Sequence, residues 1–287
     1  MQNFNDLAAA QRKSLYSKEY DRTSWFESFG SEGHFEFDIG EVALGLRQAI
    51  SERMEKASGI SIGDDLENAH HYLSEAQKSY RSQDKRNIAT TFFFDMGPSF
   101  FEPYKALIKS HLPKEFREKP LYFQSAPNIR VQTPCPSFAS EFPSFHTDLC
   151  LGHHTREMNI WVPVTKRATG HGFRLMPLEP SCKVLKAVDH DMDSLSDYLN
   201  ESSHRTQKNF DESFEVTTEF GSALAFDGRC IHSTIPLEDH TRISIDIRLI
   251  TIEEFDDLGI IFRGTGNKPM EFAPGGYYAS ESNQVLK

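Results

Sequence analysis

The segment RISIDIRLI, residues 242–250, constrains the fold most strongly because polar and apolar residues alternate from Arg242 to Leu249. Successive side chains of a β-strand point to opposite faces of the sheet, so Ile243, Ile245, Ile247 and Leu249 share one face. Arg242, Ser244, Asp246 and Arg248 share the other face. Arg248 therefore points toward whatever Arg242 faces.

Short segments with the same β-forming character fill residues 121–249. Runs rich in Val, Ile, Phe and Thr alternate there with clusters of Pro, Gly and Ser. This texture is typical of a many-stranded antiparallel sandwich or barrel. The predicted strands are IRVQT, MNIWVPVT, GFRLMPL, FEVTTEF, SALAFDG and RISIDIRLI.

The rest of the chain has a different pattern. Residues 40–82 and 100–111 show helical spacing of apolar residues, and Leu112-Pro113 is expected to end the second helix. The polar stretch 189–211 is expected to be an insertion or loop between strands. We therefore predict one structural domain with three regions. Residues 1–120 are a mainly helical region packed on the barrel, residues 121–252 are the β-stranded core, and residues 253–287 are a tail.

Composition excludes several classes of protein. The chain has 31 basic and 42 acidic residues and a formal net charge of −11, which disfavours nucleic acid and anionic lipid as partners. No segment has the length of apolar residues that a membrane span requires. The four cysteines are far apart and form no C-x-x-C pair, which argues against a zinc knuckle or a disulfide scaffold. We expect a cytoplasmic protein that is a monomer or a homodimer.

The segment FHTD offers two metal ligands. His146 and Asp148 are two residues apart, so in a strand they project to the same side. A third ligand must come from elsewhere, and His232 in GRCIHST lies on a predicted strand that would cross the barrel. Two histidines and one carboxylate leave three positions of an octahedral iron open. The neighbouring His153 and His154 are expected to be loop residues.

Arginines on the predicted strands suit a bound carboxylate. Arg242 follows His232 by ten residues, and a guanidinium grips a carboxylate with two parallel hydrogen bonds. Arg248 is a second candidate, for the substrate or for Asp246. Arg130 and Gln132 share a face of IRVQT, and either of them is placed to reach a carboxylate or to make a cross-strand contact.

Taken together, FHTD, MNIWVPVT, GRCIHS and TRISIDIR resemble the Fe(II)/2-oxoglutarate-dependent dioxygenases, in particular the StrG-like group related to the phytanoyl-CoA hydroxylases. The resemblance covers residues 132–249. It implies a mainly β fold with N-terminal helices, whose core is a double-stranded β-helix, a cupin-like jelly roll packed by helices. Tyr277 and Tyr278 in APGGYY resemble a closing tail element of this group.

The resemblance also implies roles for individual residues. His146, Asp148 and His232 would bind Fe(II), and Arg242 would hold 2-oxoglutarate, with Arg248 as the alternative anchor. The other cofactor-binding candidates are Gln132 and Asn159, and the substrate-binding candidates are Arg248, Arg130 and Trp161.

The implied reaction is the oxidation of an unactivated C–H bond by O2, with release of succinate and CO2. Its outcome would be hydroxylation, desaturation or ring closure. The substrate is expected to be a small, carboxylated or amino-acid-derived specialised metabolite, partly because Arg130, Arg174 and Arg248 are spare cations. Two alternatives remain: a cupin-type metal-dependent enzyme that does not use 2-oxoglutarate, and a non-catalytic β-sandwich module that binds a ligand.

Overall fold

The computed structural model describes residues 1–20, 22, 29–78, 88, 96–134, 145–166, 172–264 and 270–280. Its strands are β1 (Gln2–Asn3), β2 (His34–Asp38), β3 (Leu121–Gln124), β4 (Asn128–Gln132), β5 (Met158–Pro163), β6 (Phe173–Leu175), β7 (Phe214–Val216), β8 (Ser222–Asp227), β9 (His232–Thr234), β10 (Arg242–Thr251), β11 (Ile260–Arg263), β12 (Glu271–Phe272) and β13 (Tyr278–Ser280).

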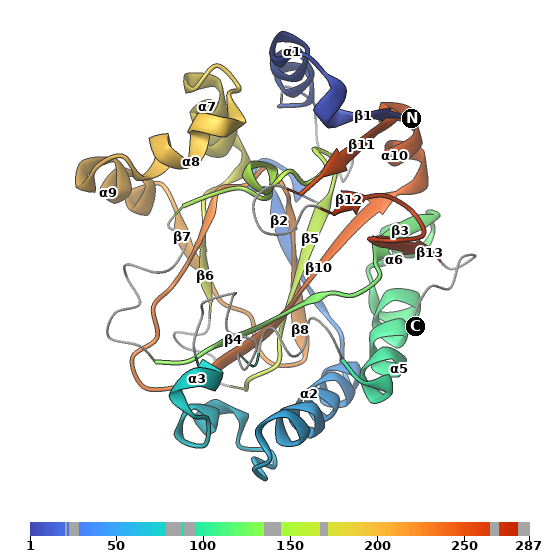
Figure 1. Cartoon of the computed structure of the whole chain (residues 1–287), viewed down its shortest axis with the longest axis vertical. Helices are drawn as coiled ribbons and strands as arrows, with labels where there is room; N and C mark the ends of the chain where they lie inside the picture. Colours follow the sequence, from blue (N-terminus) through green and yellow to red (C-terminus); the bar gives the residue numbers. More distant parts are fainter. Residues whose placement is uncertain are drawn as a thin grey trace.

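The helices lie mainly at the ends of the chain and between β6 and β7 (Figure 1). The α-helices are α1 (Ala9–Tyr20), α2 (Val42–Ser58), α3 (Glu75–Lys78), α5 (Pro98–Ala106), α6 (Lys114–Arg117), α7 (Leu178–Ala187), α8 (Met192–Asn200), α9 (Ser203–Asp211) and α10 (Ile252–Leu258). The 3-10 helices are η1 (Phe4–Asp6), η3 (Leu66–His71) and η6 (Asp148–Leu151), and η4 (Leu107–His111) is a π-helix.

Two antiparallel sheets form the centre of the protein. The large sheet has seven strands in the order β13-β3-β10-β5-β8-β2, with β4 also paired to β10. The small sheet has the order β7-β6-β9, and residue His146 adds an antiparallel bridge to His232 on its β9 side. A third, small sheet contains β1, β11 and β12.

The chain passes repeatedly from one main sheet to the other. It runs from β4 in the large sheet to the bridge at His146, back to β5, across to β6 and β7, back to β8, across to β9 and finally to β10. Eight segments that alternate in this way between two facing antiparallel sheets define the jelly roll, or double-stranded β-helix. The predicted fold class is confirmed.

The two faces of the large sheet pack against different partners. Ile243, Ile245 and Ile247 of β10 belong to a buried cluster that also contains Leu46, Ile50 and Met54 of α2 and Phe100 and Tyr104 of α5. Figure 1 shows α2 and α5 running along the edge of the sheet assembly. The opposite face looks toward the small sheet, and the cluster between the sheets consists of Trp161, Phe173, Leu175, Val216, Leu224, Phe226 and Cys230.

Each of the six predicted strands overlaps an observed strand, and the predicted helix at 100–111 is present as α5 and η4. The helix expected over 40–82 is shorter, because Gly59 adopts the left-handed conformation, with φ 73°, at the end of α2. Both terminal regions add strands to the large sheet, β2 from residues 1–120 and β13 from the tail. Among the described helices, none combines the length and the apolar character that a membrane crossing needs.

The expected insertion at 189–211 is present between two strands, but it is not a loop. The segment forms α8 and α9, an insertion between β6 and β7 that is helical. Met192, Leu195 and Leu199 have helical spacing and are buried, and the Asp191 side chain accepts a hydrogen bond from the backbone N–H of Asp193 at the start of α8. The high charge of the segment hid this short apolar stripe.

Two leucines of α2 test the packing of this helix on the large sheet. Leu46 is fully buried, whereas Leu44 on the same helix is 55% exposed. We expect Leu46→Ala to lower the free energy of unfolding by about 2–5 kcal/mol, because it leaves a cavity in the core. Leu44→Ala should change it by no more than about 0.5 kcal/mol. Urea denaturation of both variants checks this, and equal losses would contradict the packing.

Candidate metal centre

His146 and His232 face each other at the end of the small sheet. Their backbones exchange two hydrogen bonds, with N···O distances of 2.9 Å and 2.8 Å. Directly paired residues of antiparallel strands point their side chains to the same face, and the two imidazole centroids are 4.4 Å apart. The fold thus brings together two histidines that are 86 positions apart in the sequence.

Asp148 completes a group of three possible metal ligands. Thr147 is extended and its side chain accepts from the backbone N–H of Leu149, so Asp148 becomes the first residue of η6. One ligand atom each of His146, Asp148 and His232 lies within 4.8 Å of the other two. Two imidazoles and one carboxylate at this spacing can share one metal ion on a single face.

The imidazole of His232 is held in one orientation. Its Nδ1 lies 3.0 Å from the carbonyl oxygen of Cys230, so Nδ1 carries the proton and donates it to that carbonyl. The rings of Phe226 and Phe173 pack against the imidazole, with centroids 5.4 Å and 6.2 Å away. Nε2 therefore keeps its lone pair for a metal ion.

Arg248 neutralises the buried Asp148. Its Nη2 and Nε lie 2.7 Å and 3.2 Å from the same oxygen, Oδ2, and each side chain is only 4% exposed. Burial alone would raise the pKa of Asp148, but the charge of Arg248, helped by His153 and the two paired histidines, holds this pKa well below its usual range. The carboxylate is therefore ionised at neutral pH and ready to bind a cation.

Two buried amides lie on the same face of the large sheet as the arginines of β10. Asn159 is paired with Arg248 across β5 and β10, and Gln132 is paired with Arg242 across β4 and β10. Neither the oxygen nor the nitrogen of either amide has a hydrogen-bond partner among the described residues. An unpaired buried amide is costly, so both amides are candidates for contact with a bound ligand.

Arg242 lies farther from the paired histidines than Arg248. Its Nη1 donates to the carbonyl oxygen of Gly172. Gly172 is three residues before Leu175, which is paired with His232, so this contact lies roughly 10 Å along the small sheet from the histidines. A Cβ on Gly172 would meet the carbonyl oxygen of Val216 at 1.8 Å, so only glycine fits there.

The other candidate arginines have partners. Arg130 pairs with Asp246 at 2.8 Å, and its side chain is 55% exposed. Asp246 is thus the partner of Arg130. The expectation that Arg248 pairs with Asp246 is wrong. Arg174 donates to the hydroxyl of Ser213 and to the carbonyl of Phe210, away from the ligands. Trp161 is buried in the cluster between the sheets, where its ring meets Phe173 edge to face.

A second polar group beside Asp148 was not predicted. The buried carboxylate of Glu157 lies 2.8 Å from Nδ1 of His153 and also accepts from the hydroxyl of Tyr278. The hydroxyl of Tyr277 is buried next to them without a partner among the described residues, and burial together with Glu157 raises its pKa well above the usual value. The APGGYY motif indicated a closing tail element but not this contact.

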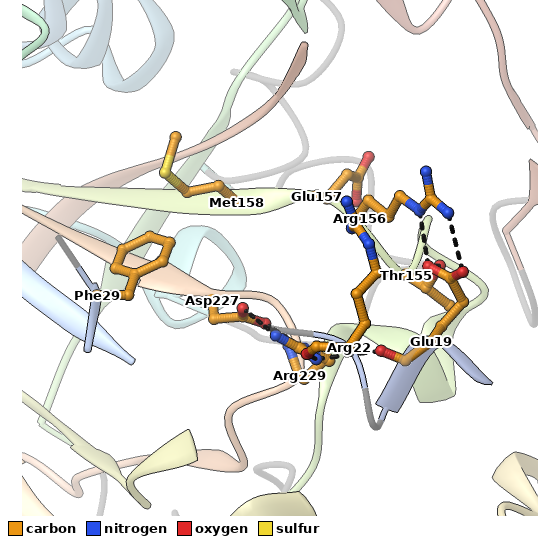
Figure 2. Close-up of a pocket in the computed structure, with 9 residues that line it drawn as sticks. All are labelled: Glu19, Arg22, Phe29, Thr155, Arg156, Glu157, Met158, Asp227 and Arg229. Carbon is orange, nitrogen blue, oxygen red and sulfur yellow. Dashed lines mark hydrogen bonds and ion pairs between the residues drawn. The ribbon is translucent and has the colours of Figure 1, made fainter. Parts of the chain in front are cut away.

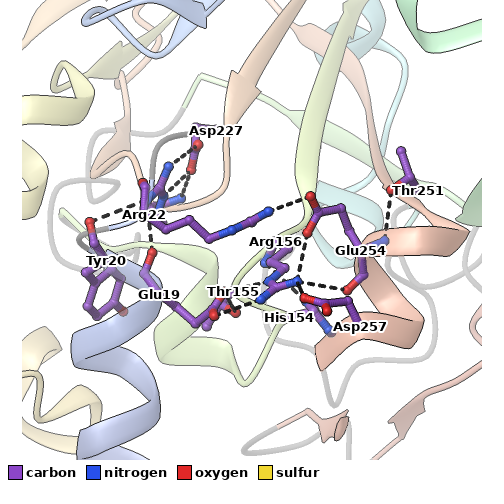
Figure 3. Close-up of polar contacts among 11 residues, drawn as sticks. Glu19, Tyr20, Arg22, His154, Thr155, Arg156, Asp227, Thr251, Glu254 and Asp257 are labelled. Carbon is purple, nitrogen blue, oxygen red and sulfur yellow. Dashed lines mark hydrogen bonds and ion pairs between the residues drawn. The ribbon is translucent and has the colours of Figure 1, made fainter. Parts of the chain in front are cut away.

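An ion-pair network holds the loop between η6 and β5. Arg156 binds Glu19 of α1 with Nε at 2.7 Å and Nη2 at 3.0 Å. Its Nη1 donates to Glu254 and Asp257 of α10, at 2.8 Å and 2.6 Å (Figure 3). Burial opposes the charge of Arg156, but Glu19 and Asp257 outweigh it, and the pKa of the guanidinium is raised. The loop that follows Asp148 is thereby fixed to helices from both ends of the chain.

A second buried pair lies beside this network. Arg229 contacts both carboxylate oxygens of Asp227, at 2.9 Å and 2.8 Å, and donates to the carbonyl oxygen of Glu19. Figure 2 shows this pair and the Arg156–Glu19 pair at the margins of one small cavity. The cavity is lined by Glu19, Arg22, Phe29, Thr155, Arg156, Glu157, Met158, Asp227 and Arg229. Each charged side chain of the lining has a polar partner, either within the lining or just outside it, as in the Arg22–Glu254 pair and the contact of Glu157 with His153. We therefore interpret the cavity as part of the support.

We compared the chain with known proteins. No family model and no curated protein matches the sequence. Among solved structures, the non-heme alpha ketoglutarate dependent carbocyclase SnoK from nogalamycin biosynthesis is 12% identical, with a TM-score of 0.44 over 96% of this chain and 97% of that chain. EctD from S. alaskensis with bound Fe is 12% identical, with a TM-score of 0.42 over 92% and 80% of the two chains.

The non-heme alpha ketoglutarate dependent epimerase SnoN is 14% identical, with a TM-score of 0.41 over 90% of this chain and 93% of that chain. Likeness of this degree does not assign a family or an activity to the chain.

His154 gives the stability of this region a pH dependence. Burial, together with Arg156 and Arg22, lowers the pKa of His154 from 6.5 to about 3, and its Nδ1 accepts from the backbone N–H of Arg156. Below pH 6.5 the unfolded chain binds a proton that the folded chain refuses, so stability is lost as the pH falls from 6.5 toward 3.

We therefore expect the native protein to lose about 2 kcal/mol more stability than His154→Phe between pH 7 and pH 5. Denaturant unfolding of both proteins at the two pH values measures this difference. Parallel losses would show that His154 does not remain neutral in the fold.

Proposed function

We propose that this protein is an Fe(II)/2-oxoglutarate-dependent oxygenase. The convergence of His146, Asp148 and His232 at one end of the two facing sheets is the observation that supports this proposal most directly. This set contains two imidazoles and one carboxylate that Arg248 keeps ionised, which suits a divalent iron ion with open coordination positions. The orientation of His232 by the Cys230 carbonyl further supports a ligand role, since metal-binding histidines are usually fixed in this way.

The residues present also suit 2-oxoglutarate. Arg242 would hold the carboxylate farther from the metal, because its guanidinium contact lies roughly 10 Å along the small sheet from His232. Gln132 is paired with Arg242 and would supply its buried amide to the same carboxylate, and Asn159 would supply its amide nearer the metal. Arg248 is occupied by Asp148, so we prefer Arg242 as the anchor.

With both groups bound, iron and 2-oxoglutarate supply the activation of O2 that oxidises a C–H bond, with release of succinate and CO2. The chain's own contribution is positioning and exclusion of water. The buried Asp148–Arg248 pair and the aromatic rings around His232 form a dry environment on one side of the ligands. Hydrogen bonds in such an environment hold a ligand more firmly than those exposed to water.

We propose a small polar specialised metabolite as the substrate. The expectation that Arg130, Arg174 and Arg248 are spare cations is wrong, because all three have partners. Arg130 and Asp246 form the exposed pair on the site face of the large sheet. The carboxylate of an amino-acid-derived substrate would bind Arg130, and its ammonium would bind Asp246. Trp161 would support this pair as a buried packing residue.

Anaerobic titration of the Fe(II)-loaded protein with 2-oxoglutarate tests the proposal. We expect one equivalent of iron and the weak visible absorption band of 2-oxoglutarate chelated to Fe(II). Arg242→Ala should weaken 2-oxoglutarate binding about 100-fold, because two charge-assisted hydrogen bonds are lost. Its iron content should not change.

Arg117→Ala is the matched control, because Arg117 lies in α6 and donates to the carbonyl of Leu112. It should leave both binding steps unchanged. Bound iron without the band would favour the cupin-type alternative, in which 2-oxoglutarate is not used. A protein that binds no iron would favour the non-catalytic β-sandwich module.

A further inference from the structure

Arg248 binds the carboxylate of Asp148 through one oxygen only. Nη2 and Nε both donate to Oδ2, at 2.7 Å and 3.2 Å, which departs from the side-by-side pairing in which a guanidinium contacts both oxygens. Arg229, by contrast, contacts both oxygens of Asp227. The Arg248 contact therefore leaves Oδ1 of Asp148 as the oxygen that faces no guanidinium.

The number of carboxylate oxygens on the metal decides how many coordination positions stay open. A carboxylate that binds through both oxygens occupies two positions, and with two histidines it would leave two positions of an octahedron. A carboxylate that binds through one oxygen leaves three. A guanidinium that occupies Oδ2 favours the second arrangement, because Oδ2 cannot turn to the metal without losing two charge-assisted hydrogen bonds.

Arg248 is well placed for this task because it is rigid and permanently charged. It lies in β10, within the large sheet, where β5 flanks it and Asn159 is its partner residue. The side chain is almost completely buried, so water does not compete for Oδ2. Burial does not neutralise Arg248, because arginine stays protonated in proteins.

We infer that Arg248 is a positioning residue that holds Asp148 as a one-oxygen ligand and so keeps three coordination positions open. The inference rests on the proposed metal centre and concerns this chain's own arginine. It replaces the expectation that Arg248 binds substrate or anchors 2-oxoglutarate.

Co(II) is a suitable probe, because its visible absorption reports the number and geometry of its ligands. We expect the native protein to bind one equivalent of Co(II). In Arg248→Met, Oδ2 is released, and the Co(II) bands should change in position and intensity as the carboxylate adds its second oxygen or rotates. In Arg248→Lys, an ammonium can still occupy Oδ2, so the native spectrum should be restored at least in part.

Arg47→Met is the matched control. Arg47 also forms a buried ion pair, with Glu67 at 2.9 Å, but it extends from α2 and does not contact the three ligands. This variant should lose stability and keep the native Co(II) spectrum. The spectrum is a better criterion than affinity, because removal of a nearby positive charge favours a cation while loss of orientation disfavours it.

An unchanged spectrum in folded Arg248→Met would overturn the inference and leave the metal centre intact. A native protein that binds no Co(II) would overturn the metal centre itself. If Arg248→Met does not fold, a crystal structure of the Co(II)-loaded native protein decides the matter. One-oxygen ligation by Asp148, with Oδ2 on Arg248, would support the inference, and two-oxygen ligation would refute it.

Discussion

The register of β10 is the constraint on which the rest of the structure depends. This strand pairs with β3 and β4 along one edge and with β5 along the other. Because side chains alternate with period two, a shift of one residue would place Arg242 and Arg248 in the apolar core against α2. The register that buries the isoleucines therefore also directs both arginines toward the small sheet. The position of the candidate site follows from the packing of the core.

Burial of charge explains why the groups around Asp148 are so closely connected. An unpaired ion is costly in the interior, so Asp148 is matched by Arg248, and Glu157 by His153 and the hydroxyl of Tyr278. The amides of Asn159 and Gln132 and the hydroxyl of Tyr277 are buried without a partner among the described residues. A buried polar group without a partner costs about 1–3 kcal/mol, and two such amides on one face of one sheet are most simply explained by a ligand.

The two ends of the chain complete the site although neither contains a proposed ligand. Arg156 joins the loop before β5 to α1 and α10, and β13 places Tyr278 against Glu157. The conformation of the loop after Asp148 thus depends on segments that sequence patterns assign to an outer layer. The helical insertion of α8 and α9 also supports the site. The Asn200 side chain at the end of α8 donates to the carbonyl oxygen of Phe145, next to His146.

The sequence alone determined what is local: the alternating strands and the end of the helix before Pro113. These features depend on residues a few positions apart, where the two-residue period of a strand or the cap of a helix decides the conformation. The pairing of His146 with Asp148 was found from its spacing, but its expected strand geometry was wrong, because Asp148 begins η6. The helices within 189–211 were missed because their polar residues outnumber a narrow apolar stripe. Only the tertiary structure decided which arginine contacts Asp148, and that Tyr278 reaches Glu157 across 121 positions. These contacts depend on which strands pair and in which register. Burial of the whole sheet determines the pairing and the register, and no single segment does so.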